Sequence, residues 1–124
     1  MTKVMLIEDD TTMIGLLKTL LLIDGFEVVA FQGGNGVLQV VQQEQPDVII
    51  LDVNLTNFGV NNYNGFELLK RIRSDEELKK IGVIMSSGMN YRQESKEAGA
   101  DGFVMKPYMP DDLLKLIKIT IPDD

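Results

Sequence analysis

The sequence predicts an α/β protein: a doubly wound parallel sheet of five strands with five helices. Short apolar runs alternate five times with longer amphipathic stretches, and glycine-containing joins separate them. Successive strands that are connected through a helix run parallel with right-handed crossovers, so helices are expected on both faces of the sheet. This periodicity leaves the order of the strands in the sheet open.

Five apolar runs are the predicted strands, and in chain order they cover residues 3–7, 27–31, 48–51, 83–86 and 102–105. The third run, from Val48 to Leu51, is unbroken by any polar residue. Such a run is typical of a strand that is covered on both faces. We therefore expect this strand at the centre of the sheet, with its carboxyl end only partly exposed.

The helices are predicted where apolar residues recur at helical spacing. The first carries Leu17 and Leu21 on its apolar side, with Thr11 or Thr12 as its N-cap. Asp10 flanks the pair Glu8 and Asp9, and the alternative is that it caps this helix. The other four are predicted, in chain order, around 37–41, around 66–72, over 89–98, and from about 110 to the proline at 122.

Length and composition narrow the class of protein. A chain of 124 residues fits one domain with a normal core, and we expect a single domain over 1–124 without an output domain. The absence of Cys and His excludes disulfides, His-dependent nucleophiles and His-ligated zinc, so any catalytic metal must have oxygen ligands. No membrane span or signal peptide is evident, which predicts a cytoplasmic protein, and the net charge of −7 argues against direct nucleic-acid binding.

Polar side chains follow four of the predicted strands. In chain order these are Glu8, Asp9 and Asp10, then Asp52, then Ser86 and Ser87, and finally Lys106 with Pro107. A single polar residue at a strand end is ordinary, because loops meet water there. The carboxyl ends of parallel strands meet at one edge of the sheet, however, so these groups are expected to converge on one site.

The chemistry of this group points to a divalent cation and a phosphate. Glu8, Asp9 and Asp52 can supply carboxylate oxygens to Mg²⁺, which Mn²⁺ could replace, and Lys106 can place a positive charge on a phosphate. Ser87 offers a hydroxyl to a phosphoryl oxygen. Because a carboxylate can accept a phosphoryl group as an acyl phosphate, Asp52 is the predicted phosphoacceptor.

The chain resembles the receiver domain of two-component response regulators over essentially its whole length. The motifs that carry the resemblance are, in order, VMLIEDD, PDVIILDVNL, NGFELLKRIR, VIMSSG and GADGFVMKP. The resemblance implies a flavodoxin-like receiver fold with strand order 2-1-3-4-5. It also implies that Asp52 is the phosphoacceptor and that the backbone carbonyl of Asn54 joins Glu8, Asp9 and Asp52 at the metal.

The resemblance further implies how such a domain signals. Ser87 and Lys106 take the places of the phosphate-contacting residues, Phe103 that of the switch aromatic, and Lys106-Pro107 that of a cis peptide. Phe103 could equally be a core residue. A histidine kinase or histidine phosphotransfer protein would donate the phosphoryl group. A downstream protein would bind the face of the fourth helix, fifth strand and fifth helix, with the chain a monomer or a phosphorylation-dependent dimer.

One segment departs from the family pattern. Residues 56–65 look like an insertion of about five residues, rich in Asn and Gly, and we expect a turn-rich surface loop. The hypothesis is that this loop shapes access to the site through Phe58 and Tyr63. The alternative is that it is a tolerated surface insertion without a role.

The sequence predicts a phosphorylatable receiver that has no enzymatic activity beyond its own phosphorylation chemistry, and three other functions compete with this prediction. An interaction module with a vestigial site remains open. A phosphatase of the haloacid-dehalogenase type has a DxDxT/V box, but Asn54 replaces the second acid of that box here. A flavodoxin-like FMN binder is excluded, because the carboxylates after the first strand would face a phosphate.

Overall fold

The sheet has five parallel strands in the order β2-β1-β3-β4-β5, which confirms the predicted fold class and strand order. The computed structural model describes residues 1–33, 36–55 and 64–121. The strands are β1 (Lys3–Ile7), β2 (Glu27–Phe31), β3 (Val48–Asp52), β4 (Gly82–Ser87) and β5 (Gly102–Met105). The helices are α1 (Thr11–Ile23), α2 (Val37–Glu44), α3 (Gly65–Ser74), α4 (Arg92–Glu97) and α5 (Pro110–Thr120).

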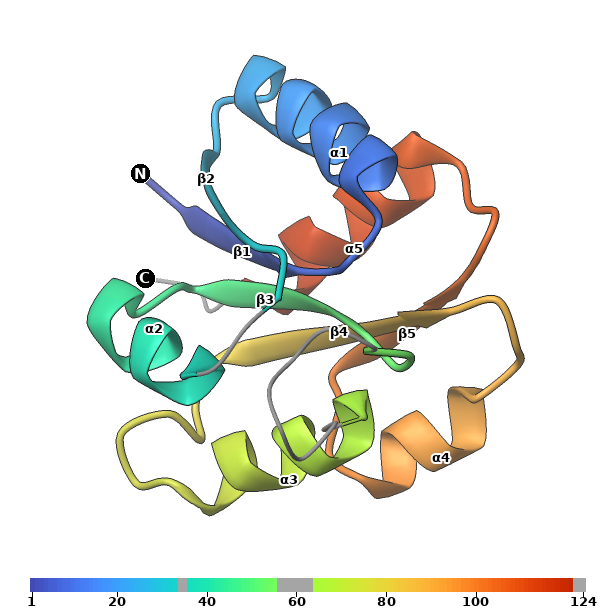
Figure 1. Cartoon of the computed structure of the whole chain (residues 1–124). Coiled ribbons are helices and arrows are strands. Elements are labelled where there is room, and N and C mark those ends of the chain that lie inside the picture. The colour runs from blue at the N-terminus through green and yellow to red at the C-terminus, as the bar shows by residue number, and fades with distance from the viewer. Residues whose placement is uncertain (34–35, 56–63, 122–124) are drawn as a thin grey trace.

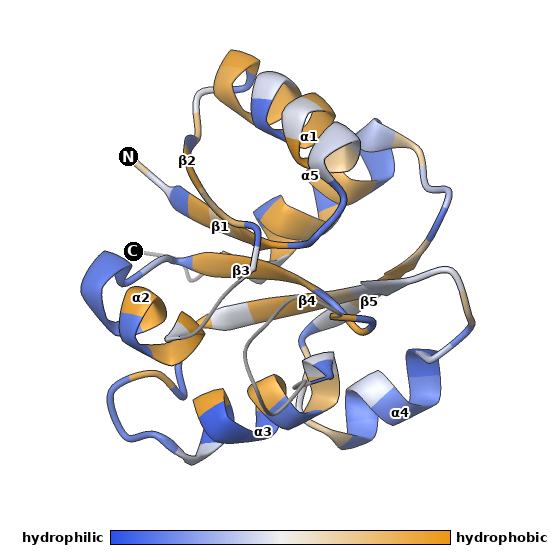
Figure 2. Ribbon diagram, in the orientation of Figure 1, coloured by the Kyte–Doolittle hydropathy of each residue, from blue (hydrophilic) through white to orange (hydrophobic). Residues whose placement is uncertain are grey.

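The helices form two layers, with α1 and α5 on one face of the sheet and α2, α3 and α4 on the other (Figure 1). Because side chains alternate along a strand, each strand feeds both layers. In β1, Val4 and Leu6 pack in the core with α1 and α5, whereas Met5 and Ile7 pack in the core on the opposite face. Figure 2 shows the strands of the sheet as largely hydrophobic, in contrast to the hydrophilic α4.

The central strand continues further than the sequence predicted. All five residues of β3 are buried, as expected for its position between β1 and β4. The strand runs through Asp52, which pairs with Ser86 of β4, and β4 itself runs through Ser87. Asp52 and Ser87 are therefore held by the sheet rather than by the loops that follow it.

The prediction that Thr11 or Thr12 caps α1 is wrong, and the alternative, Asp10, is confirmed. The cap is Asp10, whose Oδ1 accepts hydrogen bonds from the backbone N–H groups of Thr12 at 3.0 Å and Met13 at 3.1 Å. Thr11 and Thr12 already belong to the helix. A carboxylate caps at least as well as a hydroxyl and adds a negative charge where the helix dipole favours one.

The fourth helix is shorter than predicted, because α4 covers Arg92–Glu97 rather than 89–98. Of the expected insertion at 56–65, only Asn64 and Gly65 lie within the described residues. Asn64 caps α3, and its Oδ1 accepts from the backbone N–H of Glu67 at 2.9 Å. Phe58 and Tyr63 lie outside the described residues, as does the proline at 122. None of the described helices has the length and hydrophobicity that crossing a membrane requires.

Candidate functional site

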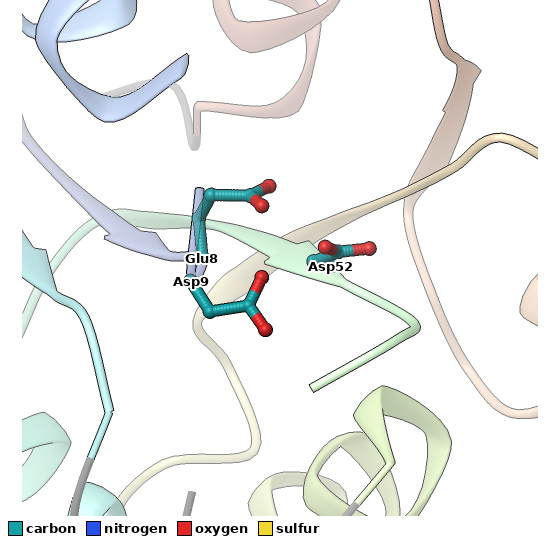
Figure 3. A group of neighbouring side chains, drawn as sticks. All are labelled: Glu8, Asp9 and Asp52. Atoms are coloured by element: carbon teal, nitrogen blue, oxygen red, sulfur yellow. The ribbon is translucent and has the colours of Figure 1, made fainter. Parts of the chain in front are cut away.

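Two neighbouring strands bring the acidic residues together. In the register of β1 and β3, Ile7 lies opposite Leu51, so the residues that follow, Glu8 and Asp52, reach the same edge of the sheet. Figure 3 shows the side chains of Glu8 and Asp9 extending toward Asp52. One carboxylate oxygen from each of the three lies within 4.8 Å of the others. The structure therefore assembles the predicted acidic cluster.

Two of these carboxylates are more buried than expected. Glu8 and Asp52 are each 5% exposed, and Asp9 is half-buried. The end of β3 was expected to be only partly exposed, and at Asp52, which pairs with Ser86 of β4, it is buried. Buried carboxylates are costly unless positive charge or hydrogen bonds compensate for the lost water.

Lys106 brings a positive charge into the cluster. Its Nζ lies 2.9 Å from Glu8 Oε2 and 3.3 Å from Asp52 Oδ2. The backbone N–H of Lys106 donates to the carbonyl oxygen of Ser87 at 2.8 Å, which fixes the residue just beyond β5. The peptide bond between Lys106 and Pro107 is cis. The ammonium thus bridges acids that follow two different strands.

The pKa values reflect this crowding. Burial raises the pKa of Glu8 to about 7; the hydrogen bond from Lys106 opposes this rise and the charge of Asp52 adds to it. For Lys106, burial lowers the pKa, but the hydrogen bond to Glu8 and the charges of Asp52 and Glu8 outweigh that effect and raise it overall. Burial also raises the pKa of Tyr108 to about 12. The ammonium therefore stays protonated, whereas the Glu8 carboxyl titrates near neutral pH.

Asp52 is held at both carboxylate oxygens. Its Oδ1 accepts from the backbone N–H of Asn54 at 3.2 Å, and its Oδ2 faces Lys106. On the neighbouring strand, the fully buried Ser87 accepts at Oγ from the backbone N–H of Met89 at 3.1 Å and from Asn54 Nδ2 at 3.5 Å. The structure thus places the predicted hydroxyl near the predicted phosphoacceptor, while the use of the Asn54 carbonyl as a metal ligand stays a prediction.

The start of α3 packs directly against the backbone of Asp52. A Cβ added to Gly65 would overlap the Asp52 carbonyl oxygen and would lie 2.8 Å from the Cα of Val53. The backbone N–H of Gly65 donates to the Val53 carbonyl at 2.8 Å. This close approach needs glycine at position 65, and it holds the carboxyl end of β3 in place.

Phe103 lies on β5 and is 6% exposed in the core that also contains Met85. The guanidinium carbon of Arg92 lies 5.5 Å from the centroid of its ring. Arg92 was not among the predicted site residues, because nothing local in the sequence links a residue of α4 to a side chain on β5. Tyr108 was not predicted either, although it directly follows the Lys106-Pro107 pair; its hydroxyl lies 3.8 Å from Met13 Sδ.

The acidic cluster suits a hard divalent cation. Every candidate ligand atom from Glu8, Asp9 and Asp52 is a carboxylate oxygen. The ammonium of Lys106 offsets only part of the charge of three carboxylates. Oxygen ligands with excess negative charge are what Mg²⁺ and similar cations prefer. The described residues therefore form an acidic pocket that could hold a metal ion.

The chain is similar to known proteins along nearly its whole length. The chain matches the sequence model of the response regulator receiver domain over residues 4–118. A nitrate/nitrite response regulator homologue of Haemophilus influenzae is 38% identical, with 94% of this chain and 55% of the relative covered. The transcriptional regulatory protein YxdJ of Bacillus subtilis is 32% identical, with 98% of this chain and 51% of the relative covered. The chain thus spans about half the length of these curated relatives.

A solved structure of similar length also matches. The chemotaxis response regulator CheY4 of Vibrio cholerae superposes with a TM-score of 0.84 and 31% sequence identity, over 98% of this chain and 99% of that one. The match therefore extends over the whole sheet and all its helices.

Proposed function

The chain belongs to the receiver domains of response regulators, and on this premise we propose that Asp52 accepts a phosphoryl group from a phosphohistidine. The donor is a histidine kinase or a histidine phosphotransfer protein. Receiver domains of this family act in two-component signalling, where they interact with histidine kinases and downstream effectors. The observation that carries the proposal is the buried Asp52 carboxylate, 3.3 Å from the Lys106 ammonium and clustered with Glu8 and Asp9.

Phosphoryl transfer from the phosphohistidine to Asp52 needs no further reactant. A carboxylate oxygen of Asp52 attacks phosphorus, the phosphorus–nitrogen bond of the donor breaks, and its electron pair stays with the imidazole nitrogen. The other ring nitrogen of the donor carries a proton, so the imidazole leaves uncharged. The product on this chain is an acyl phosphate. Because these 124 residues contain no His, the phosphohistidine lies outside them.

The residues around Asp52 stabilise the charge that moves during transfer. Glu8, Asp9 and Asp52, with the backbone carbonyl of Asn54, would hold Mg²⁺, which supplies positive charge to the phosphoryl oxygens. Lys106 exchanges its contact with the Asp52 carboxylate for a phosphoryl oxygen. This is catalysis by positioning and electrostatics, and no residue of the chain has to act as a general base.

Phosphorylation then acts as a switch. The Ser87 hydroxyl, which now accepts from the backbone of Met89, turns to donate to a phosphoryl oxygen. Phe103 follows into the vacated space, and the face of α4, β5 and α5 changes for a downstream protein. We further propose that residues 1–124 form one receiver domain and that it is cytoplasmic. Its only chemistry would be the formation and hydrolysis of its own acyl phosphate.

Intact-mass spectrometry tests the proposal. The protein is incubated with acetyl phosphate, with and without Mg²⁺, as wild type, as Asp52→Asn and as Asp111→Asn, the last a matched control at an exposed acid of α5. We expect a single phosphoryl adduct on wild type and on Asp111→Asn that requires Mg²⁺, and none on Asp52→Asn. A wild-type protein without an adduct, under conditions that trap short-lived species, would favour the interaction module with a vestigial site.

A further inference from the structure

The end of α4 is anchored by a network of hydrogen bonds around Arg73. Its guanidinium donates to the carbonyl oxygens of Gly99 at 2.8 Å and Ile81 at 2.7 Å, and to Asp101 Oδ2 at 2.9 Å. The same Asp101 oxygen accepts from the backbone N–H of Val83 at 2.8 Å. These bonds tie the turn after α4 to the starts of β4 and β5, so this end of the helix has a fixed position.

The start of α4 is held differently. Tyr91 is its N-cap and makes no capping hydrogen bond with its own side chain. The Oδ1 of the preceding Asn90 accepts from the backbone N–H of Arg92 at 3.2 Å, and two contacts with aromatic rings add to this support. Tyr91 meets Phe66 edge to face, with 5.7 Å between ring centroids, and Arg92 lies over Phe103. Contacts with aromatic rings are weaker and less directional than charge-assisted hydrogen bonds, so the start of α4 is held less firmly than its end.

Arg92 and Phe103 lie together between two surface hollows. One hollow of about 420 Å³ lies between α4 and β5, and one of about 540 Å³ lies between β5 and α5. Arg92 and Phe103 line both of them. Arg92 itself is exposed, whereas Phe103 is 6% exposed. An exposed guanidinium therefore contacts a ring that is itself buried.

We propose that Arg92 is a latch of the switch. Its contact with Phe103 holds the ring and the start of α4 in the unphosphorylated arrangement and opposes the change that phosphorylation at Asp52 brings about. The inference rests on the proposed function. A contact that exists in only one of two conformational states lowers the apparent affinity of any ligand that binds the other state. Loss of the Arg92–Phe103 contact should therefore tighten binding of a phosphoryl group at Asp52.

Beryllofluoride, a tetrahedral stand-in for the phosphoryl group, provides the test. Its affinity in the presence of Mg²⁺ is measured by NMR titration for wild type, Arg92→Ala, Arg92→Lys and Lys96→Ala. A cation over an aromatic ring at an exposed site predicts a two- to fivefold tighter affinity, roughly, for Arg92→Ala. Arg92→Lys keeps the charge but loses the planar guanidinium, so its beryllofluoride affinity should lie between those of wild type and Arg92→Ala. Lys96→Ala removes a positive charge one turn later on α4 and should bind as wild type does.

Hydrogen exchange adds a readout that needs no ligand. The backbone N–H of Ser95 donates to the Tyr91 carbonyl at the start of α4, and that of Ala100 donates to the Ser95 carbonyl at its end. In Arg92→Ala, we expect faster exchange at Ser95 and unchanged exchange at Ala100. Equal affinities and equal exchange in wild type and Arg92→Ala would overturn the latch alone. Wild-type protein that takes up neither beryllofluoride nor a phosphoryl group would overturn the proposed function, and the latch with it.

Discussion

Lys106 is the residue on which the buried acids depend in the absence of a metal. Its Nζ contacts Glu8 and Asp52, whose side chains are 7% and 6% exposed. We predict that Lys106→Met lowers the free energy of unfolding by about 2 kcal/mol at pH 8, because it leaves these carboxylates buried without their cation. Urea unfolding with and without Mg²⁺ measures this, and Mg²⁺ should narrow the difference from wild type.

The control is Lys118→Met. Lys118 Nζ lies 3.1 Å from Asp24 Oδ2, but the two side chains are 59% and 34% exposed. Exposed pairs contribute little, so this change should stay within about 0.5 kcal/mol of wild type. If both substitutions had the same small effect, the buried acids would not depend on Lys106 for compensation.

The buried hydroxyl of Ser95 lowers the stability of the protein for a different reason. It is fully buried in α4, and its Oγ has no hydrogen-bond partner among the described residues. A buried polar group without a partner costs roughly 1–3 kcal/mol, and alanine also has the higher helix propensity. We predict that Ser95→Ala raises the free energy of unfolding by about 1 kcal/mol in urea titrations. A loss of stability would show that the hydroxyl has a partner in solution.

At the scale of elements, two helical glycines should respond in opposite ways to alanine. At Gly65, the first residue of α3, an added Cβ would overlap the backbone of Asp52, so Gly65→Ala should destabilise the protein by about 1–3 kcal/mol. At Gly15 in α1, no atom lies within 4 Å of an added Cβ among the described residues. Gly15→Ala should therefore stabilise it by roughly 0.5–1 kcal/mol through helix propensity.

Thermal unfolding of both variants provides the measurement, and Gly65→Ala should also slow phosphorylation, since it displaces the strand end that carries Asp52. A stable Gly65→Ala protein with normal phosphorylation would mean that α3 can move away without disturbing the site. A destabilised Gly15→Ala protein would mean that the outer face of α1 is covered by something in solution.

The elements themselves were largely predictable. The predicted strands match the observed ones to within a residue at each end, because unbroken apolar runs mark strands that helices cover on both faces. The ends of the helices were less predictable. Asp10 rather than a threonine caps α1, since several residues in a row had capping side chains and only the backbone path selects one of them. The residue pattern alone also predicted a longer α4 than the structure has.

At the scale of the whole molecule, a metal that binds only the folded chain must stabilise it. The acidic cluster exists only where the ends of β1 and β3 meet, so the unfolded chain lacks it. At a Mg²⁺ concentration ten times its Kd, we predict a gain of about 1.4 kcal/mol in the free energy of unfolding. Differential scanning calorimetry at matched ionic strength, with NaCl as the control, would detect the rise in Tm.

Asp9→Asn should abolish most of that gain, because it removes one of the three carboxylates while keeping the shape of the side chain. Removal of Mg²⁺ with a chelator should return wild type to the Tm that it has in NaCl. An Asp9→Asn protein that Mg²⁺ stabilises as much as wild type would place the metal elsewhere on the molecule.

The sequence by itself determined the fold class, the strands and the set of acidic and basic residues that gather at their carboxyl ends. Those follow from local pattern, because side-chain alternation and helical spacing are properties of neighbouring residues. Only the tertiary structure decided that Asp52 is buried, that Lys106 bridges it to Glu8, and that Arg92 covers Phe103. These are contacts between elements far apart in the chain, and burial depends on what packs around a residue rather than on its neighbours in the sequence.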